Sequence, residues 1–254
     1  MDLERVKTTL LAAGIENAAH EARLLCAAFS GEALERAVAR RATHYPLQYI
    51  LGEWGFFNEI YEVDASCLIP RPDTEILVER AVKMLPDGAR FLDLCTGSGC
   101  VAVSTLAARP DTTAVAVDLF EDTLAIAARN AARNGVAQRL QLVQADVLKK
   151  PPVMGPFDAI LSNPPYIPDA VVPTLSEEVH CEPSAALCGG EDGLDFYRAI
   201  LQNWRALLTP NGFLLLEIGY DQAEALRALG EAVGLQVSVY RDYGGNDRVV
   251  LLRQ

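Results

Sequence analysis

From about residue 75 onward, short apolar runs alternate with helical patterns, and this alternation most constrains the fold. Each run is almost continuously hydrophobic, which is typical of parallel strands that are covered on both faces. Between the runs lie stretches such as "EDTLAIAARNAARNG", which has helical periodicity and which Gly135 would end. Such alternation predicts a doubly wound α/β sheet. The expected strands are 90–95, 112–118, 140–146, 157–163 and 212–218.

Two further strands, 235–242 and 248–253, are expected at the C-terminal end, joined only by "YGGND". That loop is too short for a parallel crossover, which needs about a dozen residues or more. The pair is therefore predicted to form an antiparallel hairpin at the end of the sheet. The predicted fold class is α/β, with a seven-stranded sheet that ends in this hairpin.

The N-terminal part of the chain has a different character. Leu3, Val6 and Leu10 recur at helical spacing, and similar patterns continue to about residue 45. The next stretch, "YPLQYILGEWGFFNEIYEVD", is aromatic, marked by glycines and partly alternating, which predicts a β-hairpin. We therefore expect a small helical domain at 1–45, a hairpin linker at 46–74 and an α/β domain at 75–254.

Charge and hydropathy limit the classes of function. The formal net charge is −12, which argues against a duplex nucleic-acid binder and is compatible with a basic protein partner. No apolar run reaches the ~18 residues of a membrane span, and the N-terminal residues lack a signal-peptide layout. We expect a soluble, cytoplasmic monomer with no membrane partner and no direct nucleic-acid partner.

The six cysteines include no C-x-x-C pair and are expected to be reduced. His180, Cys181 and Cys188 lie near one another in sequence, but their spacing matches no usual zinc pattern. No metal site is predicted.

The segment "LDLCTGSGCVA" follows an expected strand and opens an expected helix. Gly97 and Gly99 would let the backbone come close to a ligand. The N-terminus of the following helix would face the same ligand with its partial positive charge. Asp118 ends the next strand, where its carboxylate could accept both hydroxyls of a ribose. A structural turn without ligand is the alternative. Asp146 ends the third strand, and its carboxylate has two possible roles: it could contact the amino group of an adenine, or it could cap a local turn.

The glycine turn by itself also fits the dinucleotide fingerprint. Two features favour S-adenosylmethionine over NAD. Asp93 lies just before the turn, where it would repel a pyrophosphate and attract a sulfonium or amino group. The antiparallel end of the sheet is also unlike a dinucleotide fold.

The segment "LSNPPYIP" places Asn163 at the end of a buried strand. Pro164 has no N–H, and Pro165 restricts Pro164 to extended geometry, so the turn would be rigid. The Asn163 side-chain oxygen and the Pro164 carbonyl would then form two acceptors aimed at one planar –NH2 group, over which Tyr166 could pack. A structural Pro-Pro turn is the alternative.

Such a nitrogen is a poor nucleophile because its lone pair is delocalised. Two acceptors would stabilise the positive charge that develops as the nitrogen attacks, by about 1.5–3 kcal/mol each. An oxyanion hole stabilises developing negative charge with donors, whereas this site would stabilise developing positive charge with acceptors. Positioning of the nitrogen beside an activated methyl group would supply the remaining rate acceleration.

With these motifs the chain resembles the HemK-like protein-glutamine methyltransferases. The resemblance covers nearly the whole chain, because "PLQYILGEWGFFN" and "LIPRPDTEILVE" precede the glycine turn and "EPSAALCGGEDGLDFYR" and "LEIGYDQ" follow "NPPYIP". Asn-Pro-Pro-Tyr alone is shared with adenine-amine methyltransferases of DNA and RNA, and the flanking blocks make the match specific.

The resemblance implies transfer of a methyl group from S-adenosylmethionine to the glutamine amide in the Gly-Gly-Gln loop of a release factor. S-adenosylhomocysteine would be the product, and the N-terminal helices would help to grip the factor. The implied substrate site is Asn163, Pro164, Pro165 and Tyr166. The implied cofactor site is Cys95, Thr96, Gly97, Ser98, Gly99, Asp118, Asp146, Val147 and Asn163.

The chain departs from the family at two of these positions. The family usually has Gly where this chain has Cys95, and some relatives carry an aromatic residue at the position of Val147. In "PRPDTE", Asp73 or Thr74 is predicted to cap the helix that begins at Glu75, while a ligand role for Arg71 or Glu75 stays open.

Three alternatives to a release-factor methyltransferase remain at this point. A nucleic-acid amine methyltransferase would label DNA or RNA instead of protein. A binding module without catalysis would bind the cofactor and show no turnover. An NAD oxidoreductase would prefer NAD to S-adenosylmethionine.

Overall fold

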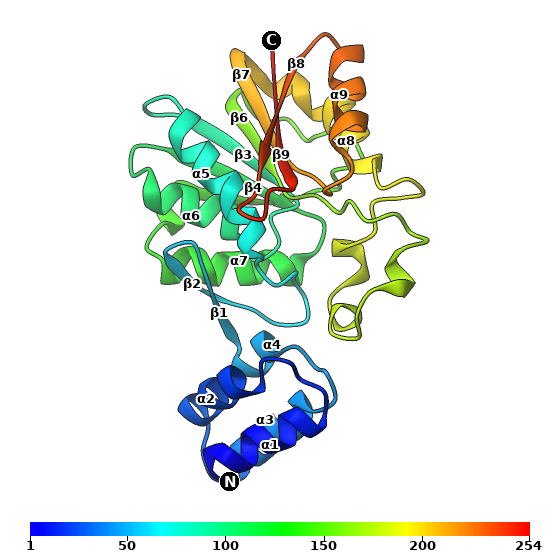
Figure 1. The fold of residues 1–254 in the computed structure, drawn as a ribbon. Helices are drawn as coiled ribbons and strands as arrows, with labels where there is room; N and C mark the ends of the chain where they lie inside the picture. Colours follow the sequence, from blue (N-terminus) through cyan, green and yellow to red (C-terminus); the bar gives the residue numbers. More distant parts are fainter.

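The computed structural model describes residues 1–254, and a seven-stranded sheet forms its centre (Figure 1). The strand order is β5-β4-β3-β6-β7-β9-β8. The five strands from β5 to β7 run parallel, whereas β9 is antiparallel to both of its neighbours. The strands are β3 (Arg90–Leu94), β4 (Thr113–Asp118), β5 (Leu140–Gln144), β6 (Phe157–Ser162), β7 (Leu208–Glu217), β8 (Gln236–Arg241) and β9 (Asp247–Arg253).

The sheet confirms the predicted fold class, including the C-terminal hairpin. Every expected strand is present, although β7 begins at Leu208, earlier than its apolar run, because this residue pairs with Phe157 across a register irregularity. Side chains alternate between two cores. Phe91 faces one cluster of buried residues, and its neighbours Leu92 and Leu94 face another on the opposite side.

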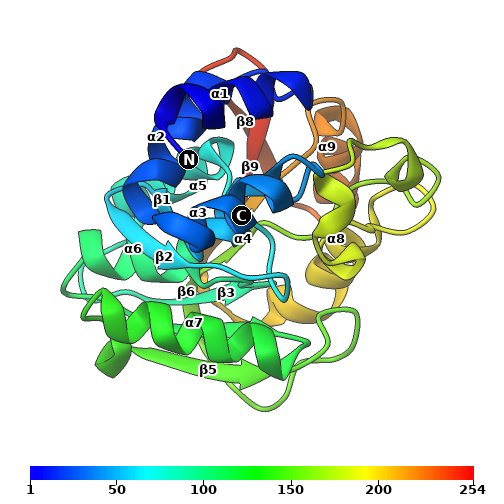
Figure 2. The same ribbon diagram turned by 90° about the horizontal axis from the view of Figure 1, so that it is seen from below.

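Helices cover both faces of the sheet (Figures 1 and 2). Three of them pack on the face of Phe91: α5 (Glu75–Met84), α6 (Cys100–Ala108) and α7 (Glu121–Arg133). The other face carries α8 (Asp195–Ala199), which continues as a π-helical turn through Ile200–Trp204, and α9 (Ala223–Ala232). Short helical turns lie at Pro72–Thr74, Ala137–Arg139, Val172–Thr174, Val179–Cys181, Ser184–Ala186 and Arg205–Leu207.

The N-terminal helices form a lobe with a buried core of its own. This helical lobe comprises α1 (Leu3–Ala12), α2 (Ala18–Ala28), α3 (Gly31–Arg41) and the short α4 (Leu47–Leu51). Residues 47–51 were expected in the hairpin region, but Leu47 joins the core of the lobe. The antiparallel hairpin β1 (Glu53–Phe56) and β2 (Glu59–Glu62) follows and packs against α7.

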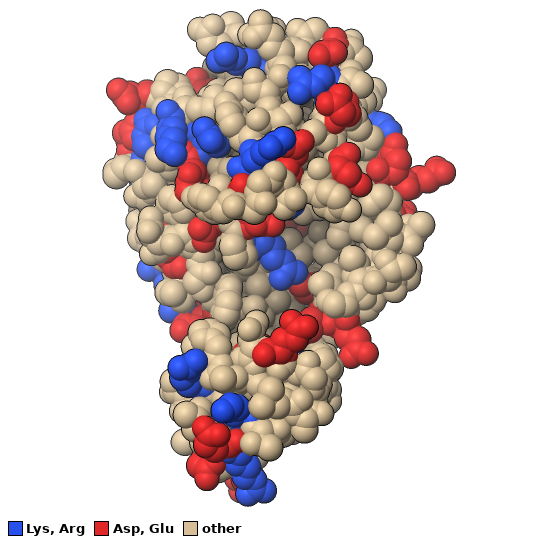
Figure 3. All heavy atoms as spheres, viewed as in Figure 1, with Lys and Arg blue, Asp and Glu red and all other residues tan.

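A hollow separates the helical lobe from the body of the molecule on the face seen in Figure 3. The long loop between β6 and α8, residues 163–194, borders it and is called the β6–α8 loop below. None of the helices combines the length and the apolar character needed to cross a membrane. All six cysteines are free thiols.

Candidate active site

The turn between β3 and α6 has three residues with positive φ. Gly97 has φ +55° and Gly99 has φ +82°, a region that glycine reaches without steric cost. Cys95 has φ +58°, where an L-residue with a side chain is strained. The structure thus gives a physical reason why glycine was expected at the position of Cys95.

Asp93 supports this turn from beneath. It is completely buried, and its Oδ2 accepts hydrogen bonds from Thr96 Oγ1 at 2.5 Å and from the Ala102 N–H at 3.2 Å. Its Oδ1 has no partner in the protein. Burial raises the pKa of Asp93 to about 7, and the two hydrogen bonds oppose that rise.

Asp118 ends β4 beside the same turn. Its Oδ2 accepts from the Gly97 N–H at 2.9 Å and its Oδ1 from the Phe120 N–H at 3.2 Å. Burial raises the pKa of Asp118, while these backbone bonds favour the ionised form. An ionised carboxylate has about four acceptor positions, so Asp118 keeps capacity for ligand hydroxyls.

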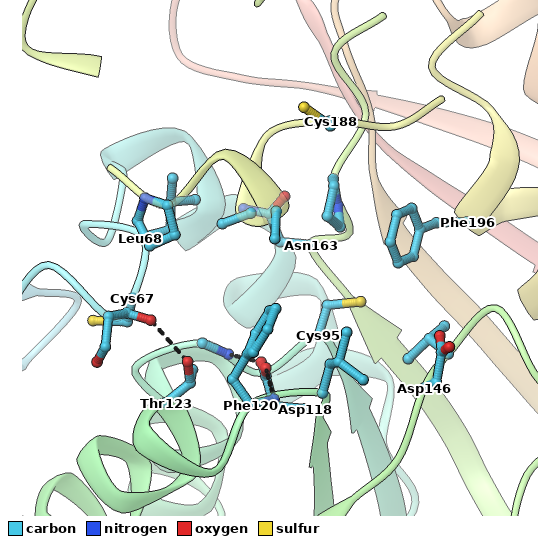
Figure 4. Close-up of a pocket in the computed structure, with 18 of the residues that line it drawn as sticks. Cys67, Leu68, Cys95, Asp118, Phe120, Thr123, Asp146, Asn163, Cys188 and Phe196 are labelled. Carbon is cyan, nitrogen blue, oxygen red and sulfur yellow. Dashed lines mark hydrogen bonds between the residues drawn. The ribbon is translucent and has the colours of Figure 1, made fainter. Parts of the chain in front are cut away.

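A cavity of about 320 Å³ opens at the carboxyl ends of β3, β4 and β5 (Figure 4). Of the predicted cofactor residues, six line it: Cys95, Gly97, Asp118, Asp146, Val147 and Asn163. The Cys95 thiol points into the cavity, on the side of Phe196. Phe120 and Phe196 belong to the lining and were missed by the sequence argument, since no motif marks them.

Three predicted cofactor residues shape the turn and do not line the cavity. Thr96 donates its hydroxyl to Asp93. The carbonyl of Ser98 accepts from Asn130 Nδ2 at 2.9 Å. Gly99 lies so close to α7 that an added Cβ would be 3.2 Å from Ala127 Cβ.

Asp146 and Val147 follow β5 at the rim of the cavity. Asp146 Oδ1 accepts from the Leu148 N–H at 3.0 Å, so the local turn contact expected as one alternative is present. Val147 is 4% exposed, and its carbonyl accepts from Trp204 Nε1 at 2.8 Å. The Val147 side chain is therefore held in a fixed place beside the cavity.

A second, smaller cavity of about 140 Å³ lies on the other side of the Asn-Pro-Pro-Tyr turn. Pro164 and Tyr166 line it, Pro165 lines the first cavity, and Asn163 lines both. Neither the Asn163 Oδ1 nor the Pro164 carbonyl oxygen accepts a hydrogen bond from the protein. The two unpartnered acceptors thus belong to residues that line the second cavity, and one of these residues, Asn163, also lines the first.

Thr74 orients the Asn163 amide. The Asn163 Nδ2 donates to Thr74 Oγ1 at 3.0 Å. The sequence predicted that Asp73 or Thr74 would cap α5, and this prediction is wrong, because neither side chain accepts a bond from the first turn. Instead, the turn at Pro72–Thr74 leads directly into the helix, and Asp73 pairs with Arg248 at 3.2 Å.

Two later segments brace the Asn-Pro-Pro-Tyr turn, which explains the family blocks recognised in the sequence. A Cβ at Gly189 would lie 2.8 Å from Tyr166 Cα and 2.9 Å from the Pro165 carbonyl oxygen. Gln222 Nε2 donates to the Tyr166 carbonyl at 3.0 Å and to the Gly193 carbonyl at 3.2 Å.

Arg71 and Glu75 have structural partners. The Arg71 guanidinium lines the second cavity and is paired with Glu182, whose other oxygen accepts from the Ile69 N–H at 3.1 Å. Glu75 accepts from the Phe57 N–H at 2.9 Å and so ties α5 to the hairpin of β1 and β2.

The residues of the first cavity fit S-adenosylmethionine. Its volume is within the ~300–1,000 Å³ of small-molecule sites. Asp118 offers acceptors for a ribose, and apolar side chains form most of the lining. The buried Oδ1 of Asp93 has no partner in the protein, and a cationic ligand on the other side of the turn would favour the ionised form of this carboxyl group.

The sheet with its antiparallel end, taken together with the curated relatives, identifies an S-adenosylmethionine-dependent methyltransferase. A release factor glutamine methyltransferase of Cereibacter sphaeroides is 43% identical to the chain, over 96% of the chain and 94% of the relative. The chain belongs to the release factor glutamine methyltransferase family.

Further comparisons agree with this assignment. The family described as "Methyltransferase small domain" matches residues 72–187. A release factor glutamine methyltransferase of Nitratidesulfovibrio vulgaris is 44% identical, over 85% of the chain and 75% of the relative. The solved structure of a methyltransferase from Pyrococcus furiosus has a TM-score of 0.58 at 20% identity, covering 78% of the chain and 90% of that protein, and bears on the fold alone.

Proposed function

We propose that this chain transfers a methyl group from S-adenosyl-L-methionine to the side-chain amide nitrogen of the glutamine in the Gly-Gly-Gln motif of a peptide chain release factor. The product from the cofactor would be S-adenosyl-L-homocysteine. The observation that carries the proposal is the pair of unpartnered acceptors, Asn163 Oδ1 and the Pro164 carbonyl, on neighbouring residues of the second cavity, of which Asn163 also lines the first. The names of the relatives support the same substrate.

The second cavity would hold the glutamine amide. A primary amide has two N–H groups on one planar nitrogen, which matches two acceptors at one place. Asn163 Oδ1 and the Pro164 carbonyl would each accept one of them, and Tyr166 would pack on the amide plane. The two bonds favour growing positive charge on the nitrogen and contribute about 1.5–3 kcal/mol each when it is charged.

The first cavity would hold the cofactor, with Asp118 on the ribose hydroxyls, Asp146 on the adenine amino group and Val147 against the ring. S-adenosylmethionine supplies a methyl group on positively charged sulfur, which keeps the electron pair of the broken bond and leaves as a neutral thioether. Asn163 belongs to both sites, so it would set the amide nitrogen in line with that methyl group.

The attacking nitrogen must finally lose a proton. The two acceptors weaken its N–H bonds, and the methylated amide cation is a strong acid, so water can take the proton without a dedicated base. This chain's residues therefore act by holding and orienting the amide and by surrounding it with apolar walls such as Leu175, Val179 and Leu187.

The substrate protein would occupy the hollow beside the β6–α8 loop (Figure 3). We assign gripping of the release factor to a helical domain at 1–45, connected by a linker at 46–74 to the catalytic domain at 75–254. Because release factors act in translation, the reaction would take place in the cytoplasm, with the enzyme as a monomer.

Incubation with methyl-labelled S-adenosylmethionine tests the proposal. Three acceptors are compared: a bacterial release factor, the same factor with its Gly-Gly-Gln glutamine replaced, and total cellular DNA and RNA. Label on the intact factor alone is the expected result. Label on nucleic acid, or label on the factor without its glutamine, would overturn the proposed substrate.

Asn163→Ala is the corresponding test of the site. Loss of one acceptor is expected to lower turnover on the order of 100-fold to 1,000-fold while cofactor binding is largely kept. Asn58→Ala, at an exposed asparagine of the hairpin turn, is the matched control and is expected to leave turnover unchanged. A fully active Asn163→Ala enzyme would contradict the assigned role.

A further inference from the structure

Arg71 is the only cationic side chain that lines either cavity, and the function proposed above does not use it. It lies in the second cavity together with Asn163 and Pro164, the residues that would hold the acceptor amide. Its side chain is 37% exposed, so a ligand in that cavity can contact it. A charged hydrogen-bond donor is thus present beside the place proposed for the substrate glutamine.

Both ends of Arg71 are held in place. Pro72 restricts the residue before it to an extended backbone, and Arg71 has φ −102° and ψ 140°. The Arg71 carbonyl accepts from the Thr74 N–H at 3.0 Å. At the other end, Nη2 of Arg71 donates to Oε1 of Glu182, whose side chain is 2% exposed. Oε2 of Glu182 accepts from the Ile69 N–H at 3.1 Å, so the carboxylate that anchors the guanidinium is itself fixed.

Most donors of this guanidinium remain free. An arginine has five N–H groups, and the bond to Glu182 is the only hydrogen bond that the Arg71 side chain makes within the protein. Nε and Nη1 have no partner, and neither is among the buried polar atoms that lack one. Both are therefore accessible to a ligand. Because the side chain is already fixed, binding there costs little further conformational entropy.

The charges around Arg71 favour a neutral acceptor. Glu182 balances its positive charge, and Glu217, the last residue of β7, also lines the second cavity. Burial raises the pKa of Glu217 to about 7. The cavity thus has no excess positive charge for an anion such as a phosphate or a carboxylate. A peptide carbonyl oxygen is neutral and accepts hydrogen bonds, and beside glycines no side chain shields it.

We propose that Arg71 is a substrate-binding residue whose free N–H groups donate to backbone carbonyl oxygens of the release-factor loop that carries the acceptor glutamine. Glu182 is the positioning residue that holds the guanidinium for this contact. The inference rests on the proposed glutamine methylation and assigns recognition of the loop main chain to a group apart from the Asn-Pro-Pro-Tyr turn.

The proposed contact has a kinetic signature. The main chain of the loop does not react, so Arg71 would bind it equally well in the ground state and in the transition state. Loss of such a contact raises KM and leaves kcat nearly unchanged. Loss of an acceptor for the reacting nitrogen, in contrast, lowers kcat.

The first test measures release-factor methylation by Arg71→Met and Arg71→Lys. Loss of a hydrogen bond from a charged donor should raise the KM of Arg71→Met for the factor on the order of 10-fold to 100-fold, with kcat nearly unchanged. Arg71→Lys keeps the charge without the planar fork of donors and should recover only part of the affinity. Arg227→Met is the control, because Arg227 is 39% exposed on α9 and lines neither cavity. It should leave both constants unchanged.

A second variant guards against a folding defect. Arg71→Met leaves the buried Glu182 carboxylate without its counterion, which destabilises a protein. The double variant Arg71→Met with Glu182→Gln removes both charges, so it should melt at a higher temperature than Arg71→Met and keep the same raised KM. Glu182→Gln alone keeps the guanidinium but loosens its anchor, and its KM should rise less than that of Arg71→Met.

Cofactor affinity separates this role from a contact with the carboxylate of S-adenosylmethionine. Calorimetry compares S-adenosylhomocysteine with 5′-methylthioadenosine, which lacks the amino-acid part. Arg71→Met should bind both as tightly as the wild type does. Weaker binding of S-adenosylhomocysteine alone would show that Arg71 holds the cofactor carboxylate, and it would overturn the inference.

The outcomes separate the inference from the proposed function. If the wild-type enzyme methylates the release factor and Arg71→Met has the wild-type KM, the inference is wrong and the function stands. A fall in kcat at unchanged KM would also overturn the inference. Failure of the wild-type enzyme to methylate the factor would overturn both.

Discussion

The guanidinium of Arg41 lies 2.7 Å from a carboxylate oxygen of Glu178, a residue 137 positions further along the chain. Arg41 ends α3 in the helical lobe, and Glu178 belongs to the β6–α8 loop, close to the walls of the second cavity. Arg41 also binds Glu21 of α2 at 2.5 Å, and both side chains of that pair are nearly buried. The lobe and the loop are thus joined through one arginine.

Two substitutions at this junction should have different effects on stability. Arg41→Ala leaves Glu21 buried without a counterion and should lower the free energy of unfolding by about 3–5 kcal/mol. Glu178→Ala keeps the Arg41–Glu21 pair and removes a partly exposed partner, for a loss of about 0–1 kcal/mol. Urea denaturation measures both values.

Hydrogen exchange adds a second readout for Glu178→Ala. Amides of residues 172–182 should exchange faster because the loop has lost its contact with the lobe. Glu32→Ala removes an exposed ion pair within α3 and is the control that should change neither property. Equal destabilisation by Arg41→Ala and Glu178→Ala would contradict this account of the junction.

Gly189→Ala tests the bracing of the Asn-Pro-Pro-Tyr turn. The added Cβ would meet backbone atoms of Tyr166 and Pro165 at less than 3 Å, so the turn must shift. Overpacking of this kind costs about 1–3 kcal/mol, and methylation should fall more strongly than cofactor affinity. In Gly55→Ala, the control, the nearest atom is 3.8 Å away, so both properties should stay unchanged.

The sheet was predictable because each strand of an α/β protein carries its own local signal. Near-continuous apolar runs marked β3 to β7, and the short "YGGND" loop determined the direction of β9 relative to β8. The positions of Gly97, Asp118 and Asn163 at one edge followed from the topology, since parallel strands end on the same side.

The contacts that orient the site could not be predicted in the same way. Thr74 precedes a helix, which favours a cap, yet its hydroxyl bonds Asn163, a residue 89 positions away. The Tyr166–Glu217 bond and the Arg41–Glu178 pair likewise join residues that are 51 and 137 positions apart. Local sequence patterns determine elements, whereas these bonds depend on how separate elements pack.

The raised pKa of Asp93 predicts how stability changes with pH. Its value is about 7 in the folded protein against 3.8 for an ordinary aspartate, and burial is the main cause. Between these values the folded state holds a proton that the unfolded state has lost. The contribution of Asp93 to the free energy of unfolding is therefore most favourable below pH 4. It decreases as the pH rises through 7, by roughly 4 kcal/mol at most.

Asp93→Asn should flatten this dependence, because asparagine is isosteric and does not titrate. The Tm of wild type, Asp93→Asn and Asp87→Asn, whose aspartate is fully exposed, is compared between pH 5 and 8. Glu217 contributes with the same sign, so Asp93→Asn should keep part of the slope. A variant that is as pH-sensitive as the wild type would show that Asp93 is not the group responsible.

Cys95 offers a test in which the strain of one backbone position is separated from the chemistry of its side chain. At φ +58° an L-residue is strained by about 1–2 kcal/mol, and the thiol also projects into the first cavity, where we propose that the cofactor binds. Cys95→Ala removes the thiol and keeps the strain, whereas Cys95→Gly removes both. Glycine costs about 0.5–1 kcal/mol in backbone entropy, so Cys95→Gly should be the more stable of the two by about 1 kcal/mol. Both variants should bind S-adenosylmethionine at least as tightly as the wild type, as measured by calorimetry.

The order of the two stabilities decides whether backbone strain matters here. A Cys95→Gly protein that is less stable than Cys95→Ala would mean that strain does not govern this position.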